Sequence, residues 1–178
     1  MKTEELTEKI LKEAVFYIQS YISIKQHELK AYLKEVERWN ENKRYAIQSL
    51  LTSLDKAYNE ANNLINEQNN VALNGAIQKL LTEQRKSQQK FLKASIADIV
   101  ESIIQKYWEP VIDTFAIPRF KGDKVIDNIV GDLYSVDFQQ FATDCVVEVI
   151  DRSSTSKFLD TEIEKARKKT INYDKIIK

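Results

Sequence analysis

The chain has 178 residues, of which 43% are hydrophobic and 30% charged, and its 27 basic and 27 acidic side chains cancel. This length fits one domain with its own core, and the composition excludes both a membrane-spanning chain and a disordered one. Neutrality also argues against a nucleic-acid binder that neutralises phosphates with a basic excess, although a local basic patch stays open.

Glycine and proline are scarce in this chain. Residues 1–74 contain neither, and the first proline is Pro110. Because turns need the conformations that these two residues supply, such a chain is built from long helices with few connections. The sequence therefore predicts an all-α protein: an elongated antiparallel bundle, or coiled-coil hairpin, of long N-terminal helices in residues 1–109. Shorter helices in residues 110–178 are expected to pack at one end of it within a single structural domain.

The first predicted helix covers residues 4–39. Thr3 followed by Glu4 and Glu5 is typical of a helix start. At 1.5 Å per residue the helix would be about 54 Å long, against a radius of gyration of about 16 Å for a round domain of this size, so the sequence predicts an elongated molecule. Lys25 is the one interruption in its heptad seam. The apolar seam positions are Leu11, Val15, Ile18, Ile22, Leu29, Tyr32, Val36 and Trp39.

A second seam follows with a phase shifted by one residue. The slip falls in residues 40–44, a polar stretch with two asparagines, which favours a corner between two helices. One continuous helix with a local stutter is the competing interpretation, since no glycine or proline forbids it. The second seam consists of Ile47, Leu50, Leu54, Ala57, Ala61, Leu64, Gln68 and Val71.

Seven asparagines lie between residues 59 and 74. Asparagine is a poor residue inside a helix because its side chain competes for backbone hydrogen bonds. The tract therefore predicts a helix end, and Asn74-Gly75 is the expected stop because glycine suits the left-handed position after a helix.

A third helical pattern begins at Ile77, and the tract over residues 82–90 contains nothing apolar. Beyond it a broad apolar face runs from Phe91 to Tyr107 and is expected to end at Trp108 and Pro110. Two interpretations stay open for the polar tract: the solvated middle of one helix, or the corner between two.

Three shorter helices are predicted in the C-terminal part. The first covers residues 125–133. The second has a cap at Ser135 and an apolar face that includes Cys145, and the third begins at Ser156 and runs to about Lys169. Residues 145–150 are β-branched enough for a strand, but a lone strand would have no partner, so a helix is expected.

No constellation in the chain points to catalysis, a cofactor or a metal. Cys145 is the only cysteine and His27 the only histidine, so cysteine–histidine zinc sites and di-iron sites are excluded. Cys145 is expected to be a core residue rather than a nucleophile. The carboxylates of Asp144, Glu148 and Asp151 share one helical face, which is typical of a solvated surface. We therefore expect a protein that is not an enzyme.

The candidate docking site lies in the punctuated segment over residues 109–123, which is expected to be a loop. Loops are normally polar, yet this one carries an apolar cluster with an arginine, and exposed aromatic and arginine side chains are typical interface anchors. The favoured interpretation of the segment is a lid that folds across the end of the bundle, and the functional one is a docking knob. The candidate residues are Phe115, Ile117, Pro118, Arg119 and Phe120.

Charge is unevenly distributed along the chain. Residues 79–93 carry five basic and one acidic side chain, residues 94–151 eleven acidic and four basic, and residues 152–178 eight basic and four acidic. Packing of basic helices beside acidic ones explains this pattern better than a partner-docking surface. The basic stretch at residues 164–169 is expected to be a solvated helix end.

Long helices with heptad seams mainly offer surface to other helices. The leading hypothesis is a non-catalytic interaction or assembly subunit that binds a protein partner or forms a homo-oligomer. A membrane-active helical bundle and a nucleic-acid accessory protein that uses residues 79–93 and the basic tail are the alternatives. The first residues, MKTEELTEKI, lack the apolar region of a signal peptide, so a cytoplasmic protein is expected.

Overall fold

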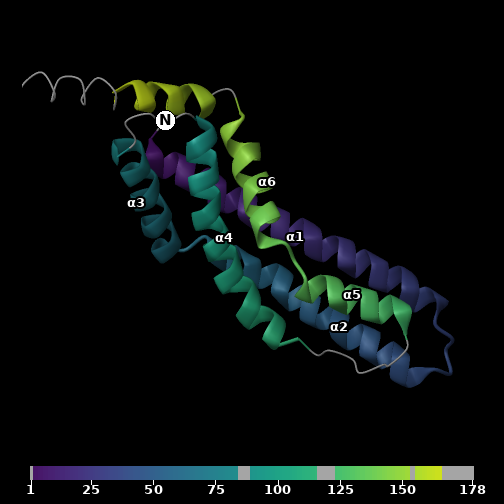
Figure 1. Cartoon of the computed structure of the whole chain (residues 1–178). Helices are drawn as coiled ribbons and strands as arrows, with labels where there is room; N and C mark the ends of the chain where they lie inside the picture. The colour runs from purple at the N-terminus through teal and green to yellow at the C-terminus, as the bar shows by residue number, and fades with distance from the viewer. Residues whose placement is uncertain (1, 84–88, 116–122, 153–154, 166–178) are drawn as a thin grey trace, which may run out of the picture. The chain divides into compact units, whose positions relative to one another are not determined.

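The computed structural model describes residues 2–83, 89–115, 123–152 and 155–165, and every regular element among them is helical (Figure 1). The predicted all-α class is therefore confirmed. Residues 155–165 form a further helical segment. The labelled elements are α1 (Thr3–Glu35), α2 (Glu41–Glu60), the 3-10 helix η1 (Ala61–Leu64), α3 (Glu67–Glu83), α4 (Gln89–Asp113), α5 (Lys124–Tyr134) and α6 (Phe138–Ile150).

The contacts divide the chain into two compact units, each built from separate stretches of sequence. Unit 1 consists of Met1–Ala14, Ile65–Ile104 and Phe138–Lys178. Unit 2 consists of Val15–Leu64 and Gln105–Asp137. Helices α1 and α4 each contribute residues to both units.

In unit 2 the predicted corner between α1 and α2 is confirmed, and the continuous helix is excluded. Asn40 is the N-cap of α2, where its side chain accepts a hydrogen bond from the Lys43 N–H. The Arg44 guanidinium donates to the carbonyls of Leu33 and Val36, at 3.2 and 3.0 Å, and so occupies acceptors that the end of α1 leaves open. The polar stretch thus ends one helix and starts the next.

Hydrogen bonds between α1 and α2 show how the second helix returns along the first. Gln19 donates to the carbonyl of Tyr58 on α2. Gln26, seven residues further along α1, donates to the carboxylate of Asp55, which comes earlier in α2 than Tyr58. Positions that ascend in α1 therefore meet positions that descend in α2, and the two segments run in opposite directions. Burial of the two apolar seams accompanies this pairing.

Both seams form core, but each was extended too far. Trp39 is 77% exposed because it lies beyond the end of α1, and Val71 is 66% exposed because α2 has already ended and α3 presents it outward. Lys25, the interruption in the first seam, is buried. The buried apolar seam residues are Leu11, Val15, Ile18, Ile22, Leu29, Val36, Ile47, Leu50, Leu54, Ala57, Ala61 and Leu64.

The asparagine tract ends a helix, as predicted, but at a different place. Helix α2 stops at Glu60, and Asn66 then caps α3 by accepting a hydrogen bond from the Asn69 N–H at 2.7 Å. Gly75, the expected stop, lies inside α3 and does not adopt a left-handed conformation. The expectation was wrong because Leu73 and Ile77 continue one buried helical face on both sides of the glycine.

Two predicted boundaries near the C-terminal elements were also wrong. Helix α4 continues through Pro110 to Asp113, because Val111 and Ile112 extend its buried face by another turn. Ser135 does not start α6; its hydroxyl donates to the Gly131 carbonyl at 2.7 Å and closes the end of α5.

The other C-terminal predictions are confirmed where the structure describes them. Helix α5 occupies the expected place, residues 145–150 are helical, and the last helical segment begins at residue 155, next to Ser156. Its expected end at Lys169 lies outside the described residues. The polar tract over residues 82–90 contains the end of α3 at Glu83 and the start of α4 at Gln89.

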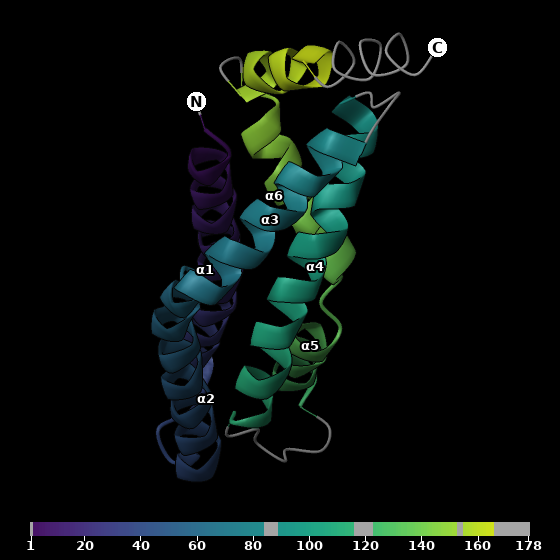
Figure 2. The same ribbon diagram turned by 90° about the vertical axis from the view of Figure 1, so that its left-hand side faces the viewer.

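Unit 1 joins the first turns of α1 to α3, α4, α6 and the segment over residues 155–165, and α3 crosses in front of α4 and α6 in Figure 2. The Cys145 thiol lies 3.5 Å from the Ile10 carbonyl in the core. Lys93 forms an ion pair with Asp151, as expected if the basic stretch packs beside the acidic one. The largest fully buried side chains of this unit include Leu6, Ile10, Leu11, Leu73, Ile77 and Leu92.

Candidate interaction surface

A polar cluster in unit 2 joins the start of α5 to α1 and α2. The Asp123 carboxylate accepts a hydrogen bond from the Tyr32 hydroxyl at 2.6 Å and forms an ion pair with the Lys43 ammonium at 2.7 Å. Its second oxygen accepts from the Ile126 N–H at 3.0 Å, which makes Asp123 the N-cap of α5. Lys43 also lies over the Tyr32 ring, 5.6 Å from its centre.

The titration of this cluster follows from its hydrogen bonds. Burial alone would raise the pKa of Asp123, but the Ile126 N–H, Lys43 and Tyr32 together outweigh it and lower the pKa to about 2. The hydrogen bond to Asp123 raises the pKa of Tyr32, and the pKa of Lys43 is raised by its bonds to Asp123 and Tyr32. The carboxylate is therefore ionised and the lysine protonated at every physiological pH.

A second polar cluster holds the other end of α5. Lys25 pairs with Asp132 at 2.7 Å, and the Tyr21 hydroxyl donates to the Asp132 carbonyl at 2.9 Å. The buried indole of Trp108 donates to the Leu133 carbonyl at 2.9 Å, and its ring meets Tyr21 edge to face. Burial lowers the pKa of Lys25, but the hydrogen bond to Asp132 and the charge of Glu28 outweigh it, so the pKa is raised.

These two clusters fasten α5 at both ends, and their polar groups are used in doing so. The lysine, tyrosine and aspartate of the first cluster bind one another, and the shifts in their pKa values keep Lys43 protonated and Asp123 ionised. Their arrangement explains how the corner after α1 is held.

Two exposed aromatic side chains flank that corner. Trp39 is 77% exposed and Tyr45 is 73% exposed, one on each side of the Asn40 cap. Between them, Lys43 binds Asp123 and Arg44 binds the end of α1. The backbone that carries the two rings is thus fixed by hydrogen bonds, while the rings themselves lie in solvent.

The predicted docking segment is only partly described. Phe115 is 8% exposed and belongs to the core of unit 2. Ile117, Pro118, Arg119 and Phe120 lie outside the described residues. The chain is described again from Asp123, which is bound to Tyr32 and Lys43 beside the corner.

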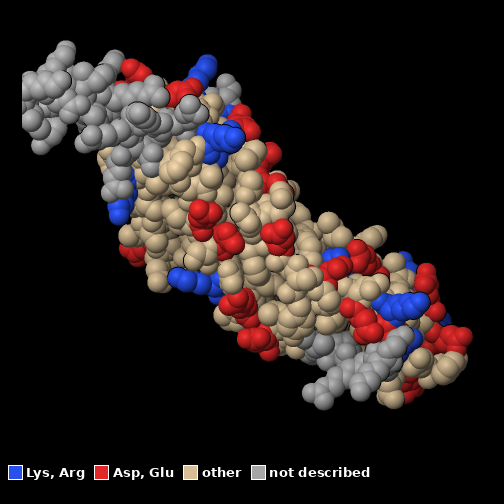
Figure 3. Space-filling model, in the orientation of Figure 1, with Lys and Arg blue, Asp and Glu red and all other residues tan. Residues whose placement is uncertain are grey.

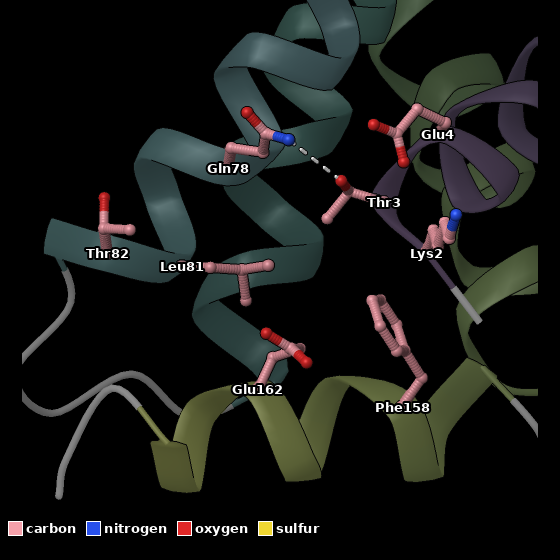
Figure 4. Close-up of a pocket in the computed structure, with 8 residues that line it drawn as sticks. All are labelled: Lys2, Thr3, Glu4, Gln78, Leu81, Thr82, Phe158 and Glu162. Atoms are coloured by element: carbon pink, nitrogen blue, oxygen red, sulfur yellow. Dashed lines mark hydrogen bonds between the residues drawn. The ribbon is translucent and has the colours of Figure 1, made fainter. Parts of the chain in front are cut away.

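A groove of about 470 Å³ lies in unit 1, between the start of α1, the end of α3 and residues 155–165 (Figure 4). Gln78 donates to the Thr3 hydroxyl at 3.2 Å across it. Its charges are of both signs, so it presents no consistent preference for a cation or an anion. The lining residues are Lys2, Thr3, Glu4, Gln78, Leu81, Thr82, Phe158 and Glu162.

The residues considered for chemistry occupy the places expected of structural ones. Cys145 is fully buried, and burial together with the charge of Glu13 raises the pKa of its thiol to about 12. His27 is exposed on α1. Asp144, Glu148 and Asp151 are exposed, as a solvated face requires. Within the described ranges no group of three histidine, cysteine, aspartate or glutamate side chains could hold a metal ion.

Two surface properties bear on the alternatives. No helix among the described residues is long and apolar enough to cross a bilayer. On the face shown in Figure 3, lysine and arginine side chains are interspersed with aspartate and glutamate rather than gathered in a block of one sign.

Comparisons with known proteins add no relative: no family model, curated protein or solved structure matches this chain.

Sequence reasoning missed the Asp123 cluster and the exposed aromatic pair. Asp123 directly precedes an apolar helix, which is a recognisable capping signal, although nothing local points to Tyr32 or Lys43 as its partners. Trp39 was assigned to the core because its spacing continues the seam, and only the end of α1 at Glu35 removes it from the core.

Proposed function

We propose that this chain is a non-catalytic interaction or assembly subunit that binds a protein partner, or a second copy of itself, through helical surfaces. The observation that supports the proposal is the exposure of Trp39 and Tyr45 on a corner whose backbone is fastened by Lys43 and Arg44. Tryptophan and tyrosine are enriched among the residues that dominate binding energy, and a fixed backbone lowers the ordering cost of association.

The other predictions about this surface join the proposal. The docking residues Ile117, Pro118, Arg119 and Phe120 lie outside the described residues, and we keep them as candidates for binding the same partner. The elongated antiparallel bundle, the coiled-coil packing, the division into residues 1–109 and 110–178 and the cytoplasmic location stay predictions. A radius of gyration well above about 16 Å in small-angle X-ray scattering would support the elongated form.

Affinity purification from the native host tests the proposal. The full chain, a variant with Trp39→Ser and Tyr45→Ser, and a control with Phe91→Ser would be compared by mass spectrometry. Phe91 is 51% exposed and lies in unit 1, so the control removes an exposed aromatic ring from another place. We expect a stoichiometric protein partner with the wild type and the control, and its loss with the double variant.

A chain that stays monomeric in light scattering and retains no stoichiometric partner would contradict the proposal. Retention of the same partner by the double variant would contradict the assignment to Trp39 and Tyr45. Co-migration with vesicles in liposome flotation, or salt-dependent binding to generic DNA or RNA, would support the membrane-active or nucleic-acid alternative instead.

A further inference from the structure

The outward face of α3 carries a row of four residues spaced four apart. Glu67, Val71, Gly75 and Lys79 are all exposed, and Val71, at 66%, is the most exposed large apolar side chain among the described residues of unit 1. Residues four apart form one ridge on a helix surface. Leu73 and Ile77 lie on the opposite, buried side, so α3 packs through one face and leaves this ridge exposed to solvent.

The ridge is polar only at its two ends. Residues 68–78 contain no charged side chain, whereas Glu67 precedes them and Lys79 follows them. A solvated helix face normally carries charges throughout, so eleven uncharged residues on an exposed helix are unusual. A shallow depression lined by Asn66, Glu67, Gln68, Val71 and Ala72 adjoins the ridge.

The ridge is complementary to a second copy of itself that runs in the opposite direction. In a second copy laid antiparallel, with a two-fold axis at the level of Leu73, the acid Glu67 faces the base Lys79. Val71 then faces Gly75, where no atom lies within 4 Å of the position that a Cβ would occupy. Each contact occurs twice, as in every isologous interface. In this one register the opposite charges face each other and the valine faces the space beside the glycine.

We propose that two copies of this chain associate through α3, with the ridges of the two helices packed antiparallel and Val71 of each seated in the notch at Gly75 of the other. The glycine allows the two backbones to approach closely, and interdigitated ridges four residues apart are a common way for helices to pack. The inference rests on the proposed function, since it names a second copy as one partner of a non-catalytic assembly subunit. Its surface lies in unit 1 and does not include Trp39 or Tyr45.

Sedimentation velocity of the full chain over a wide concentration range tests the proposal. We expect a reversible dimer in the wild type. Gly75→Leu fills the notch in both copies and should raise the dissociation constant by about a hundredfold or more. Gly75→Ala should raise it less and increase helix stability, because alanine is the better helix former and the site is open. Circular dichroism would verify that each variant folds.

A charge exchange tests the register independently of the glycine. Glu67→Lys places like charges opposite each other at two places and should weaken the dimer by about tenfold. The double variant Glu67→Lys with Lys79→Glu restores opposite charges at both places and should recover most of the affinity. Lys106→Glu, at an exposed position of unit 2, is the control for a change of net charge and should leave the dimer unchanged.

Three results would overturn the inference: a wild-type monomer at every concentration, a dimer indifferent to Gly75→Leu, or no recovery in the charge-exchanged variant. These failures are distinguishable from failure of the proposed function. A dimer that survives the α3 variants but dissociates with Trp39→Ser and Tyr45→Ser would overturn the α3 interface and support the proposed function. A monomer that still captures a partner through Trp39 would do the same.

Discussion

The two units treat their buried polar groups differently. In unit 2 the largely buried charges of Asp123 and Lys25 are bound by partners on other helices. In unit 1 the buried hydroxyls of Thr7 and Thr155 and the side-chain oxygen of Asn74 have no hydrogen-bond partner among the described residues. Unit 2 therefore places α5 through specific polar contacts, whereas the core of unit 1 encloses oxygens that no described residue pairs.

This difference teaches where stability can be lost and where it can be gained. Removing one partner of a buried ion pair lowers the free energy of unfolding by several kcal/mol, because the other charge is left buried and uncompensated. An unpaired buried hydroxyl is already unfavourable, so its removal should help. The five predictions that follow test the contrast, beginning with the largest expected effect.

The buried thiol of unit 1 should be nearly inert. With its pKa raised to about 12, Cys145 at pH 8 has a thiolate fraction about a thousandfold below that of an ordinary cysteine, and burial slows reagents further. Labelling with a thiol reagent should therefore be at least that much slower in the native chain than after denaturation. Thr52→Cys places a thiol at an exposed position of unit 2 and should react at the ordinary rate. Rapid labelling of native Cys145 would show that the core of unit 1 is open.

Removal of the Asp123 carboxylate should destabilise the protein strongly. Asp123→Ala removes the cap of α5 and both side-chain contacts, and should lower the free energy of unfolding by about 3 kcal/mol. Asp123→Asn keeps a capping oxygen and should cost about 2 kcal/mol. Urea denaturation at pH 7 measures both. Equal losses from the two variants would mean that the negative charge contributes nothing.

The Asp123 carboxylate should also make the stability of the protein depend on pH in the acid range. Its folded-state pKa of about 2 lies below the value of about 3.9 for an unfolded chain, so its contribution is complete above about pH 4 and is lost as the pH falls through about 2. Over that window the wild type should lose about 2 kcal/mol that Asp123→Asn does not lose.

The two tryptophans of unit 2 should differ when each is replaced by phenylalanine. Trp108→Phe removes the donor to the buried Leu133 carbonyl and leaves space in the core, at a cost of about 2 kcal/mol. Trp39→Phe changes an exposed ring and should alter stability by less than about 0.5 kcal/mol. Urea denaturation followed by circular dichroism compares them. A loss of similar size at position 39 would argue against its free exposure.

In unit 1, Thr7→Val should stabilise the protein. Replacing the unpaired hydroxyl by a methyl group of similar size removes a desolvation cost of about 1 kcal/mol. Thr52→Val on α2 is the matched control, since its exposed hydroxyl bonds the Gln48 carbonyl and its loss should change stability by no more than about 0.5 kcal/mol. Thermal unfolding of the two variants would separate them, and destabilisation by Thr7→Val would indicate that the hydroxyl binds a buried water.

The sequence predicted what periodicity and local capping determine. The helical class, the corner at Asn40 and the buried seams all depend on residues within a few turns of one another. The Asp123 cluster could not be predicted in this way, because Tyr32 lies 91 positions from Asp123 and no local pattern specifies which distant side chains meet. The predicted docking residues were chosen for an apolar cluster in a loop, and the one described member, Phe115, is buried.

Two local rules failed where burial opposed them. Glycine is a weak helix former, but a cost of about 1 kcal/mol is smaller than the gain from burying Leu73 and Ile77 on either side of Gly75. The same reasoning applies to Pro110, beyond which Val111 and Ile112 are buried. The prediction for Trp39 failed for the opposite reason. Its spacing continues the apolar seam, but α1 has already ended, so the side chain is not buried.

Trp39 and Trp108 are two natural fluorophores in different environments, one exposed to solvent and the other buried. Emission from an indole surrounded by water shifts when another molecule covers it, whereas emission from an enclosed indole shifts when its surroundings loosen. A variant that keeps only Trp39 would report a partner bound at the corner, and a variant that keeps only Trp108 would report melting around α5. Spectroscopy can therefore distinguish a partner that merely docks from one that remodels the helices beneath it.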